Sequence, residues 1–403
     1  MSNIMTIDQI MSGLLGNASV PHKHKEVRNK AIFRDFHGMN GGSGTTLEEQ
    51  GTVHGGLTRE CVRQVVNNIR AQFFLGPKEK AVVTKALDVV RASAPCHIGV
   101  IAETLHSKGL LSESIDQPQG LIELCGQVMK EKSAYRFPEV NGSVFAVKKG
   151  GPDLIKRIRS EANKVISSFG MVSISGLKVR VDDLSGRQDL DFIRSVVLAH
   201  DDLQFITEEW IAGSDIEDSC LARRIGTAFS VYKTVPLDAL YRVSARSLRQ
   251  IKVPEGNTPE FKAFGSSSLE ELNKDRKEKG LKPILRRPSV REQDMKMAFP
   301  LSVFEEYIDA MPGVGVTKID GKPYAFRWDG FSPSESSASD IEKQLLKAIR
   351  DSGKKELQEH EIRKAANFND KQWYSFMMAC NYSPVISRVS RGQYRLLGQV
   401  DFV

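Results

Sequence analysis

Hydrophobic residues recur at helical spacing in the first 70 residues of the chain. In residues 26–36 and 57–70, apolar positions lie three and four residues apart, which predicts one helix in each range. Residues 46–51 predict a shorter helix between them, and the glycine-rich residues 37–44 end the first one. The first twenty residues show only a weak helical pattern followed by a loop.

Beyond residue 76 the pattern changes to a series of segments in which helices precede two short strands. Segment 80–150 closes with a hairpin around Asn141-Gly142, and segment 216–330 closes with one around Asp320-Gly321. Segment 152–213 shows the same order with a weaker pattern. The polar residues 254–297 interrupt segment 216–330.

The last segment, 339–403, has the clearest pattern. Ser339 and Glu342 match a capping box, and apolar residues follow on one helical face at positions 341, 345, 346 and 349. Two more helices and two strands around Gly392 complete the segment. Three short helices and a β-hairpin are typical of a winged helix.

Charge is unevenly distributed along this chain of 403 residues with a net charge of +7. Lys274–Arg291 holds eight basic residues against two acidic ones, whereas Asp201–Asp218 holds seven acidic residues and no basic one. The basic insert could be an arm that becomes ordered on DNA or a solvated loop. Because negative charge opposes phosphate, we expect the acidic stretch to contact protein, either another domain or a partner.

The sequence argues against membrane, secreted and enzyme classes. It has no run of about 18 apolar residues, and its N-terminus lacks the basic start and long apolar core of a signal peptide. Five scattered cysteines without a CxxC pair favour reduced thiols in the cytoplasm. No catalytic, phosphate-loop or metal-ligand motif occurs, so we expect no enzyme activity, no cofactor and no metal.

The helix over residues 57–70 combines an apolar face with a face that suits the DNA major groove. Thr58 can cap its start, and Val62, Val65, Val66 and Ile69 form the apolar face. Arginine pairs with guanine, glutamine with adenine, and glutamate accepts a hydrogen bond from cytosine. The side of the helix that carries such groups consists of Arg59, Glu60, Arg63, Gln64 and Asn67.

The strings TLEEQG (46–51) and LTRECVRQ (57–64) resemble region 4 of the primary-type bacterial sigma factors. The resemblance covers residues 26–70 and implies a helix-turn-helix that reads the −35 promoter element. It implies base contacts for Arg59, Glu60 and Gln64, and a phosphate contact for Arg63. Gln50 replaces an apolar residue of the family pattern, TVHGG is one residue longer, and Cys61 replaces an arginine.

The last segment offers a second set of candidate DNA contacts. Lys371 and Gln372 are expected to face outward from its third helix, and Arg388, Arg391 and Arg395 lie on its hairpin. Arg391 is at the tip of the turn. A winged helix would place these arginines against phosphates or a minor groove.

These observations predict an α+β fold, mainly helical. The N-terminal helix-turn-helix covers residues 1–76, and tandem winged-helix-like units follow at 80–150, 152–213, 216–330 and 339–403. The expected function is sequence-specific binding of double-stranded DNA by a cytoplasmic, nucleoid-associated transcription regulator similar to bacterial and phage regulators. The alternatives are a factor associated with RNA polymerase, a DNA-maintenance protein for replication or partition, and an adaptor of a protein complex.

Overall fold

The computed structural model describes residues 5–20, 23–41, 44–131, 134–149, 153–185, 189–244, 299–328, 338–369, 372–390 and 392–398. Helices predominate and the sheets are small and antiparallel, so the predicted α+β class is confirmed. Contacts divide the chain into an N-terminal unit, Met1–Leu154 with Gln188–His200, and a C-terminal unit, Ile155–Arg187 with Asp201–Val403. Among the described residues, no helix combines the length and apolar character that a membrane crossing requires.

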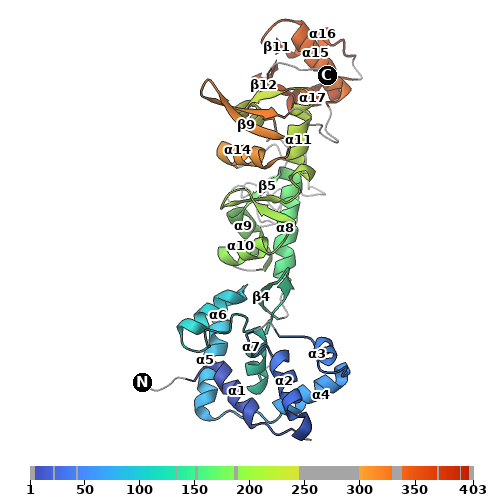
Figure 1. Ribbon diagram of the computed structural model, residues 1–403. Helices are drawn as coiled ribbons and strands as arrows, with labels where there is room; N and C mark the ends of the chain where they lie inside the picture. Colours follow the sequence, from blue (N-terminus) through green and yellow to red (C-terminus); the bar gives the residue numbers. More distant parts are fainter. Residues whose placement is uncertain are drawn as a thin grey trace, which may run out of the picture. The chain divides into compact units, whose positions relative to one another are not determined.

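The N-terminal unit consists of helices around a small sheet (Figure 1). Its helices are α1 (Ile7–Asn17), η1 (Lys23–Lys25), α2 (Glu26–Phe36), α3 (Leu47–Val53), α4 (Arg59–Arg70), α5 (Pro77–Ser93), α6 (Ile98–Ser107), α7 (Gln119–Val128) and α10 (Leu190–Leu198). Its strands are β1 (Cys96–His97), β2 (Tyr135–Arg136), β3 (Glu139–Val140) and β4 (Ser143–Lys148). β4 pairs antiparallel with each of the other three.

One hydrophobic core joins the predicted segments 1–76 and 80–150. Ile7 of α1, Val62 of α4, Val83 of α5 and Leu121 of α7 are fully buried in the same cluster. The backbone N–H of Ile7 also donates to the carbonyl of Leu110 at 2.9 Å. Helix α4 therefore rests on a core that both segments build.

Helix α10 also belongs to the N-terminal unit, although its residues fall in the predicted segment 152–213. The ring of Phe192 lies 6.1 Å from that of Phe145 on β4, edge to face. Asn141 Nδ2, at the β3–β4 turn, donates to the carbonyl of Ala199 just after α10 at 3.0 Å. The helix thus covers the sheet of the unit that precedes it in the chain.

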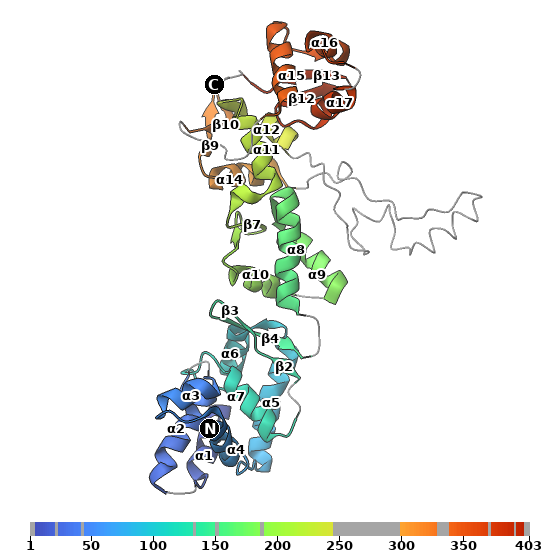
Figure 2. The ribbon, with the colours of Figure 1, turned by 90° about the vertical axis from the view of Figure 1, so that its right-hand side faces the viewer.

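The described residues of the C-terminal unit form three small sheets with their helices (Figure 2). Its helices are α8 (Leu154–Phe169), α9 (Ile174–Ser185), η2 (Ile216–Asp218), α11 (Cys220–Phe229), α12 (Leu237–Ser244), α14 (Leu301–Ala310), α15 (Asp340–Asp351), α16 (Glu359–Ala365) and α17 (Trp373–Tyr382). Its strands are β5 (Met171–Ser173), β6 (Leu203–Phe205), β7 (Trp210–Gly213), β8 (Thr234–Pro236), β9 (Val314–Ile319), β10 (Lys322–Arg327), β11 (Leu357–Gln358), β12 (Ile386–Ser390) and β13 (Gln393–Leu396).

The four sheets formed by the described residues share one topology. In each, a short strand that follows a helix pairs with the last strand of a later hairpin: β1 with β4, β5 with β7, β8 with β10, and β11 with β13. The sequence predicted the hairpins but only two strands per segment, so the expected strand count was wrong. The missed first strands have two or three residues, which is too short for a period-two pattern to be visible.

Local backbone features match the turns and caps expected from the sequence. Asn141 and Gly142 both have positive φ, as do Asp320 and Gly321, which is the conformation of two-residue hairpin turns. Ser339 Oγ accepts from the Glu342 N–H at 3.3 Å, and Glu342 Oε2 accepts from the Ser339 N–H at 2.8 Å. The predicted capping box is therefore confirmed.

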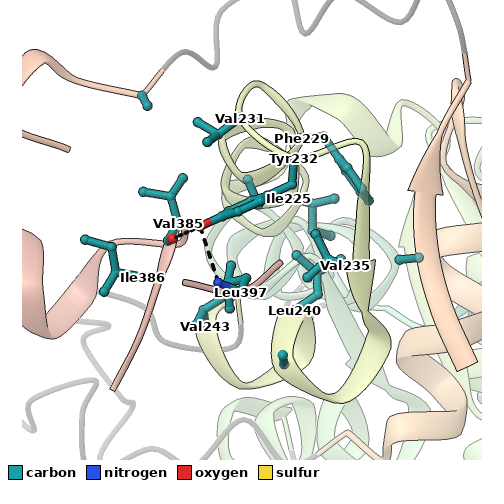
Figure 3. Packing of buried hydrophobic residues seen from close by; sticks show 14 of the residues in the cluster. Ile225, Phe229, Val231, Tyr232, Val235, Leu240, Val243, Val385, Ile386 and Leu397 are labelled. Carbon is teal, nitrogen blue, oxygen red and sulfur yellow. Dashed lines mark hydrogen bonds between the residues drawn. The ribbon is translucent and has the colours of Figure 1, made fainter. Parts of the chain in front are cut away.

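The last two segments of the chain pack together around Tyr232, which follows α11 (Figure 3). Its buried hydroxyl donates to the carbonyl of Val385 at 2.7 Å and accepts from the Leu397 N–H at 3.3 Å. The Arg224 guanidinium of α11 donates to the carbonyls of Val243 and Tyr382. These bonds fix the β12–β13 hairpin to α11 and α12.

Candidate nucleic-acid interface

The packing of α2, α3 and α4 determines which side of α4 meets solvent. Val62, Val66 and Ile69 are buried, and Val65 is partly buried, as the apolar spacing predicted. Phe33 of α2 is fully buried and its ring lies 5.2 Å from that of Phe73. One face of α4 is therefore held against the core, and the opposite face is presented to solvent.

The connection between α3 and α4 is tightly built. The Leu57 N–H donates to the carbonyl of Gly51 at 2.8 Å, and a Cβ at position 51 would overlap the Leu57 carbonyl. Gly55 and Gly56 have φ of +92° and +73°, a region that favours glycine. The turn TVHGG thus needs small residues at fixed places to bring α4 across α3.

Both helices begin at a capping threonine. Thr46 and Glu49 form a capping box at the start of α3, with the Thr46 N–H donating to Glu49 Oε2 at 2.7 Å. Thr58 Oγ1 accepts from the Cys61 N–H at 3.3 Å, so the predicted cap of α4 is confirmed. The caps fix the first turn of α4, where the candidate base-contacting residues lie.

Five of the six contact residues predicted in residues 58–67 lie together at the exposed face of α4. Thr58, Arg59, Glu60, Arg63 and Gln64 are all exposed. Arg59 retains 71% of its side-chain accessibility and forms an ion pair of 3.3 Å with Glu48 of α3. Sequence reasoning did not find Glu48 as a partner, because the pairing depends on the crossing of the two helices.

Glu60 forms hydrogen bonds with two neighbouring side chains of this face. Arg63 donates to both carboxylate oxygens of Glu60 at 2.7 and 2.6 Å, and Gln64 donates to it at 3.0 Å. These hydrogen bonds, from Arg63 first and Gln64 second, lower the pKa of Glu60 to about 2. The carboxylate is therefore ionised at neutral pH and keeps the two donors in one orientation.

Asn67 differs from the other predicted residues of α4. It is partly buried, and its Oδ1 accepts from Arg70 Nη2 at 2.6 Å. Arg70 also donates to Gln127 of α7, so this end of α4 is anchored to the rest of the unit. Asn68, one position further, is the exposed amide at this level of the helix.

The three departures from the sigma pattern have different structural settings. Gln50 is buried, and its Nε2 donates to Thr45 Oγ1 at 2.6 Å. His54, in the lengthened turn, lies 3.6 Å from an Asp35 carboxylate oxygen. Cys61 is partly buried on α4. Gln50 thus has a polar partner in its buried position.

The second predicted set, in the last segment, does not form a comparable surface among the described residues. Gln372 is partly buried, and its side chain accepts from the Asn369 N–H at 3.2 Å next to the start of α17. Arg388 is exposed and its Nε donates to the Ser390 carbonyl at 3.3 Å. Lys371, Arg391 and the basic insert 254–297 lie outside the described residues.

The two described arginines of the β12–β13 hairpin point in opposite directions. Arg388 is paired across the strands with Tyr394, which is buried, and Arg395 is paired with Ser387. Since consecutive strand residues alternate between faces, Arg388 and Arg395 lie on different faces of the hairpin. The two described cations of the predicted wing therefore lie on opposite sides of the hairpin.

The acidic stretch Asp201–Asp218 is partly neutralised by its own unit. Asp202 accepts from Arg159 at 2.9 Å and from Asn163 at 3.1 Å. Although burial opposes its ionisation, the hydrogen bonds from Asn163 and Arg159 hold its pKa below the usual value. Glu209 accepts from the Ser175 N–H at the start of α9. The remaining acidic residues of the stretch, at 201, 208, 215, 217 and 218, are exposed.

Comparison with models of protein families, with curated proteins and with solved structures finds no match to this chain. Within the described ranges, no three His, Cys, Asp or Glu side chains gather as metal ligands would. The chemistry of α4 therefore rests on its own geometry: two guanidinium groups, one carboxylate and one amide displayed from a capped helix.

Proposed function

We propose that the protein is a sequence-specific double-stranded DNA-binding protein that regulates transcription. In this proposal α2, α3 and α4 form a helix-turn-helix, and α4 enters the major groove. The single observation that carries it is the exposed face of α4, where Arg59, Glu60, Arg63 and Gln64 project from the first two turns while the opposite face is buried.

The pattern of donors and acceptors on α4 supports base recognition. The Arg59 guanidinium and the Gln64 amide can each form two hydrogen bonds with a base edge, and the Glu60 carboxylate can accept from a cytosine amino group. Arg63 is suited to a phosphate contact, which fixes position without selecting sequence. The hydrogen bonds of Glu60 with Arg63 and Gln64 orient these side chains in the absence of DNA.

The repeated topology supports a series of winged helices that begins with α5. Among the described residues, helix, short strand, two helices and hairpin follow one another in chain order four times, and each short strand pairs with the last strand of its hairpin. Tandem units of this kind can extend contact with DNA or bind partner proteins. We assign the binding of regulatory partners to these winged helices, including a protein that binds the exposed acidic stretch Asp201–Asp218.

The test begins with a duplex selected by the full-length protein from a random pool. Arg59→Ala and Gln64→Ala should each weaken binding to that duplex by about 1–3 kcal/mol, because each removes a two-bond contact with a base. Binding to a random duplex should change little for Gln64→Ala. Both affinities are measured by fluorescence anisotropy at one salt concentration.

Matched controls come from exposed helix positions elsewhere. Lys85→Ala on α5 removes a cation, and Gln344→Ala on α15 removes an amide; both side chains are exposed. We expect both controls to bind the selected duplex as the unmodified protein does. Equal losses on selected and random duplexes for Arg59→Ala and Gln64→Ala would reject base recognition by α4.

A further inference from the structure

A cleft in the C-terminal unit gathers cations from elements far apart in the chain. Its volume is about 450 Å³, within the range of ligand-binding sites. α12 lies beside β12 at this place (Figure 2). The ionisable side chains that line the cleft are Arg242, Lys354, Lys355, Arg395, Asp238 and Glu356.

The cleft carries a net positive charge that its own ion pairs do not remove. Asp238 is neutralised by Arg242 at 2.6 Å, and Lys354 is paired with Glu361 at 2.7 Å. Among the described residues, the side chains of Lys355 and Arg395 have no hydrogen-bond or ion-pair partner. Both are exposed. The Glu356 carboxylate, which also lines the cleft, accepts from Gln393 Nε2 at 2.5 Å, so the cleft offers two unpaired cations against one carboxylate.

The walls of the cleft are held in register by buried contacts. The hydroxyl of Tyr232 joins the backbone of Val385 and Leu397, and Arg224 joins Val243 to Tyr382. Val243 belongs to α12, and Leu397 follows β13, so both walls are fixed through these bonds. The backbones of α12 and of the β12–β13 hairpin therefore keep their spacing without a ligand.

The composition of the cleft favours phosphate over a base. No aromatic side chain is among the described residues that line it, so it has no platform on which a nucleobase could stack. Lysine and arginine that contact phosphates supply affinity without reading sequence. A duplex backbone passing over the opening would present phosphates and keep its bases stacked inside.

We propose that this cleft binds backbone phosphates of duplex DNA without selecting sequence, through Lys355 and Arg395. The inference rests on the proposed function, because it takes DNA as the ligand of the chain. It adds a contact that the predicted wing residue Arg388 does not make, since Arg388 lies on the other face of the hairpin.

The first test compares two double variants of the full chain on a random 20-base-pair duplex. Lys355→Gln/Arg395→Gln removes the two cleft cations, and Lys343→Gln/Lys347→Gln removes two exposed cations of α15. The slope of log affinity against log salt concentration should fall by about 1–2 for the cleft variant, which corresponds to one or two lost phosphate contacts. It should remain near the wild-type value for the control, and equal slopes for the two variants would overturn the proposal.

The second test separates this cleft from α4 and from small phosphate ligands. Modification of Lys355 by an amine-reactive ester is measured by mass spectrometry with the duplex, with ATP, or with neither. If the duplex protects Lys355 from modification in both the wild type and the Arg59→Ala/Gln64→Ala variant, the cleft binds DNA independently of base recognition by α4. If the protein binds the selected duplex while Lys355 remains unprotected, the cleft proposal is overturned but the proposed function is not. If ATP protects Lys355 and the protein binds no duplex, the assignment of DNA as the ligand is overturned.

Discussion

The exposed face of α4 and the cleft of the C-terminal unit assemble their charges in different ways. On α4 the charged and amide groups come from residues 58–64 of one capped helix, and Glu60 links two of them. In the cleft, Arg242 comes from α12, Lys355 precedes β11 and Arg395 lies on β13. The first surface mixes donors and acceptors, whereas the second is mainly cationic.

This difference separates two kinds of contact with nucleic acid. A single helix keeps its side chains at fixed spacing, which suits hydrogen bonds to particular base edges. Cations from separate elements supply attraction to phosphates, which depends on charge and salt more than on sequence. We therefore expect changes near α4 to alter selectivity, and changes near the cleft to alter the salt dependence of binding.

The largest effect is expected at the turn before α4. Gly51→Ala places a Cβ against the Leu57 carbonyl, so the turn must open. We expect the N-terminal unit to lose about 3 kcal/mol, the upper end of the cost of overpacking. Urea titrations followed by the methyl NMR signals of Ile32 and Val62 measure the loss.

The control for this prediction is another helical glycine. Gly13→Ala on α1 meets nothing within 4 Å, and it should raise stability by about 0.5–1 kcal/mol because alanine favours helix. If Gly51→Ala leaves the urea midpoint of the N-terminal unit unchanged, α3 does not approach the turn as closely as the structure shows.

A comparable effect is expected from pH in the N-terminal unit. Burial, with the charge of Arg70 second, lowers the pKa of His37 to about 4, whereas the unfolded chain takes up this proton near pH 6.5. Stability from this group is complete above pH 6.5 and is lost as pH falls towards 4. The shift corresponds to about 3 kcal/mol over that window.

The variant His37→Phe isolates this contribution. Its ring can occupy the same place beside Phe33 and Phe36 but does not titrate. The same NMR urea titrations at pH 7, 5.5 and 4 should show a flatter pH dependence for the variant. An identical pH dependence in both proteins would mean that His37 is not the titrating group.

A smaller loss of stability is expected at Tyr232, whose hydroxyl joins the last two segments of the chain. Tyr232→Phe removes the hydroxyl that satisfies the Val385 carbonyl and the Leu397 N–H, both beside a buried ring. Leaving such groups unpaired should cost the C-terminal unit about 2 kcal/mol. Tryptophan fluorescence in urea measures it, since all three tryptophans lie in this unit.

The matched substitution here is Tyr324→Phe on β10, where the ring is only partly buried. It should leave the urea midpoint almost unchanged. Should both variants behave alike, the Tyr232 hydrogen bonds do not hold the two segments together, and the fixed spacing of the cleft would have to be abandoned.

Local sequence patterns predicted much of the fold because their physical causes are local. The Asn141-Gly142 and Asp320-Gly321 turns, the Ser339–Glu342 capping box and the apolar face of α4 all depend on residues within one or two turns of each other. The exposure of Arg59, Glu60, Arg63 and Gln64 follows from that same face.

Features that depend on tertiary packing could not be predicted in this way. The ion pair of Arg59 with Glu48 needs the crossing of two helices. Arg70, the partner of the partly buried Asn67, is itself anchored to Gln127 of α7, which is 57 residues away in the chain. The cleft cations share a surface only after α12 and β13 are joined. The short first strands are defined by their partners in the hairpins rather than by their own residues.

The most direct measurement is photo-crosslinking from α4 to the selected duplex. A photoreactive benzoylphenylalanine replaces Gln64 in one protein and Lys85 in another, both at exposed positions, and the protein concentration is raised to offset the lost Gln64 contact. We predict crosslinks from position 64 to bases within the selected site, facing the major groove, and none from position 85. Efficient binding of the selected duplex without crosslinks from position 64 would contradict base recognition by α4.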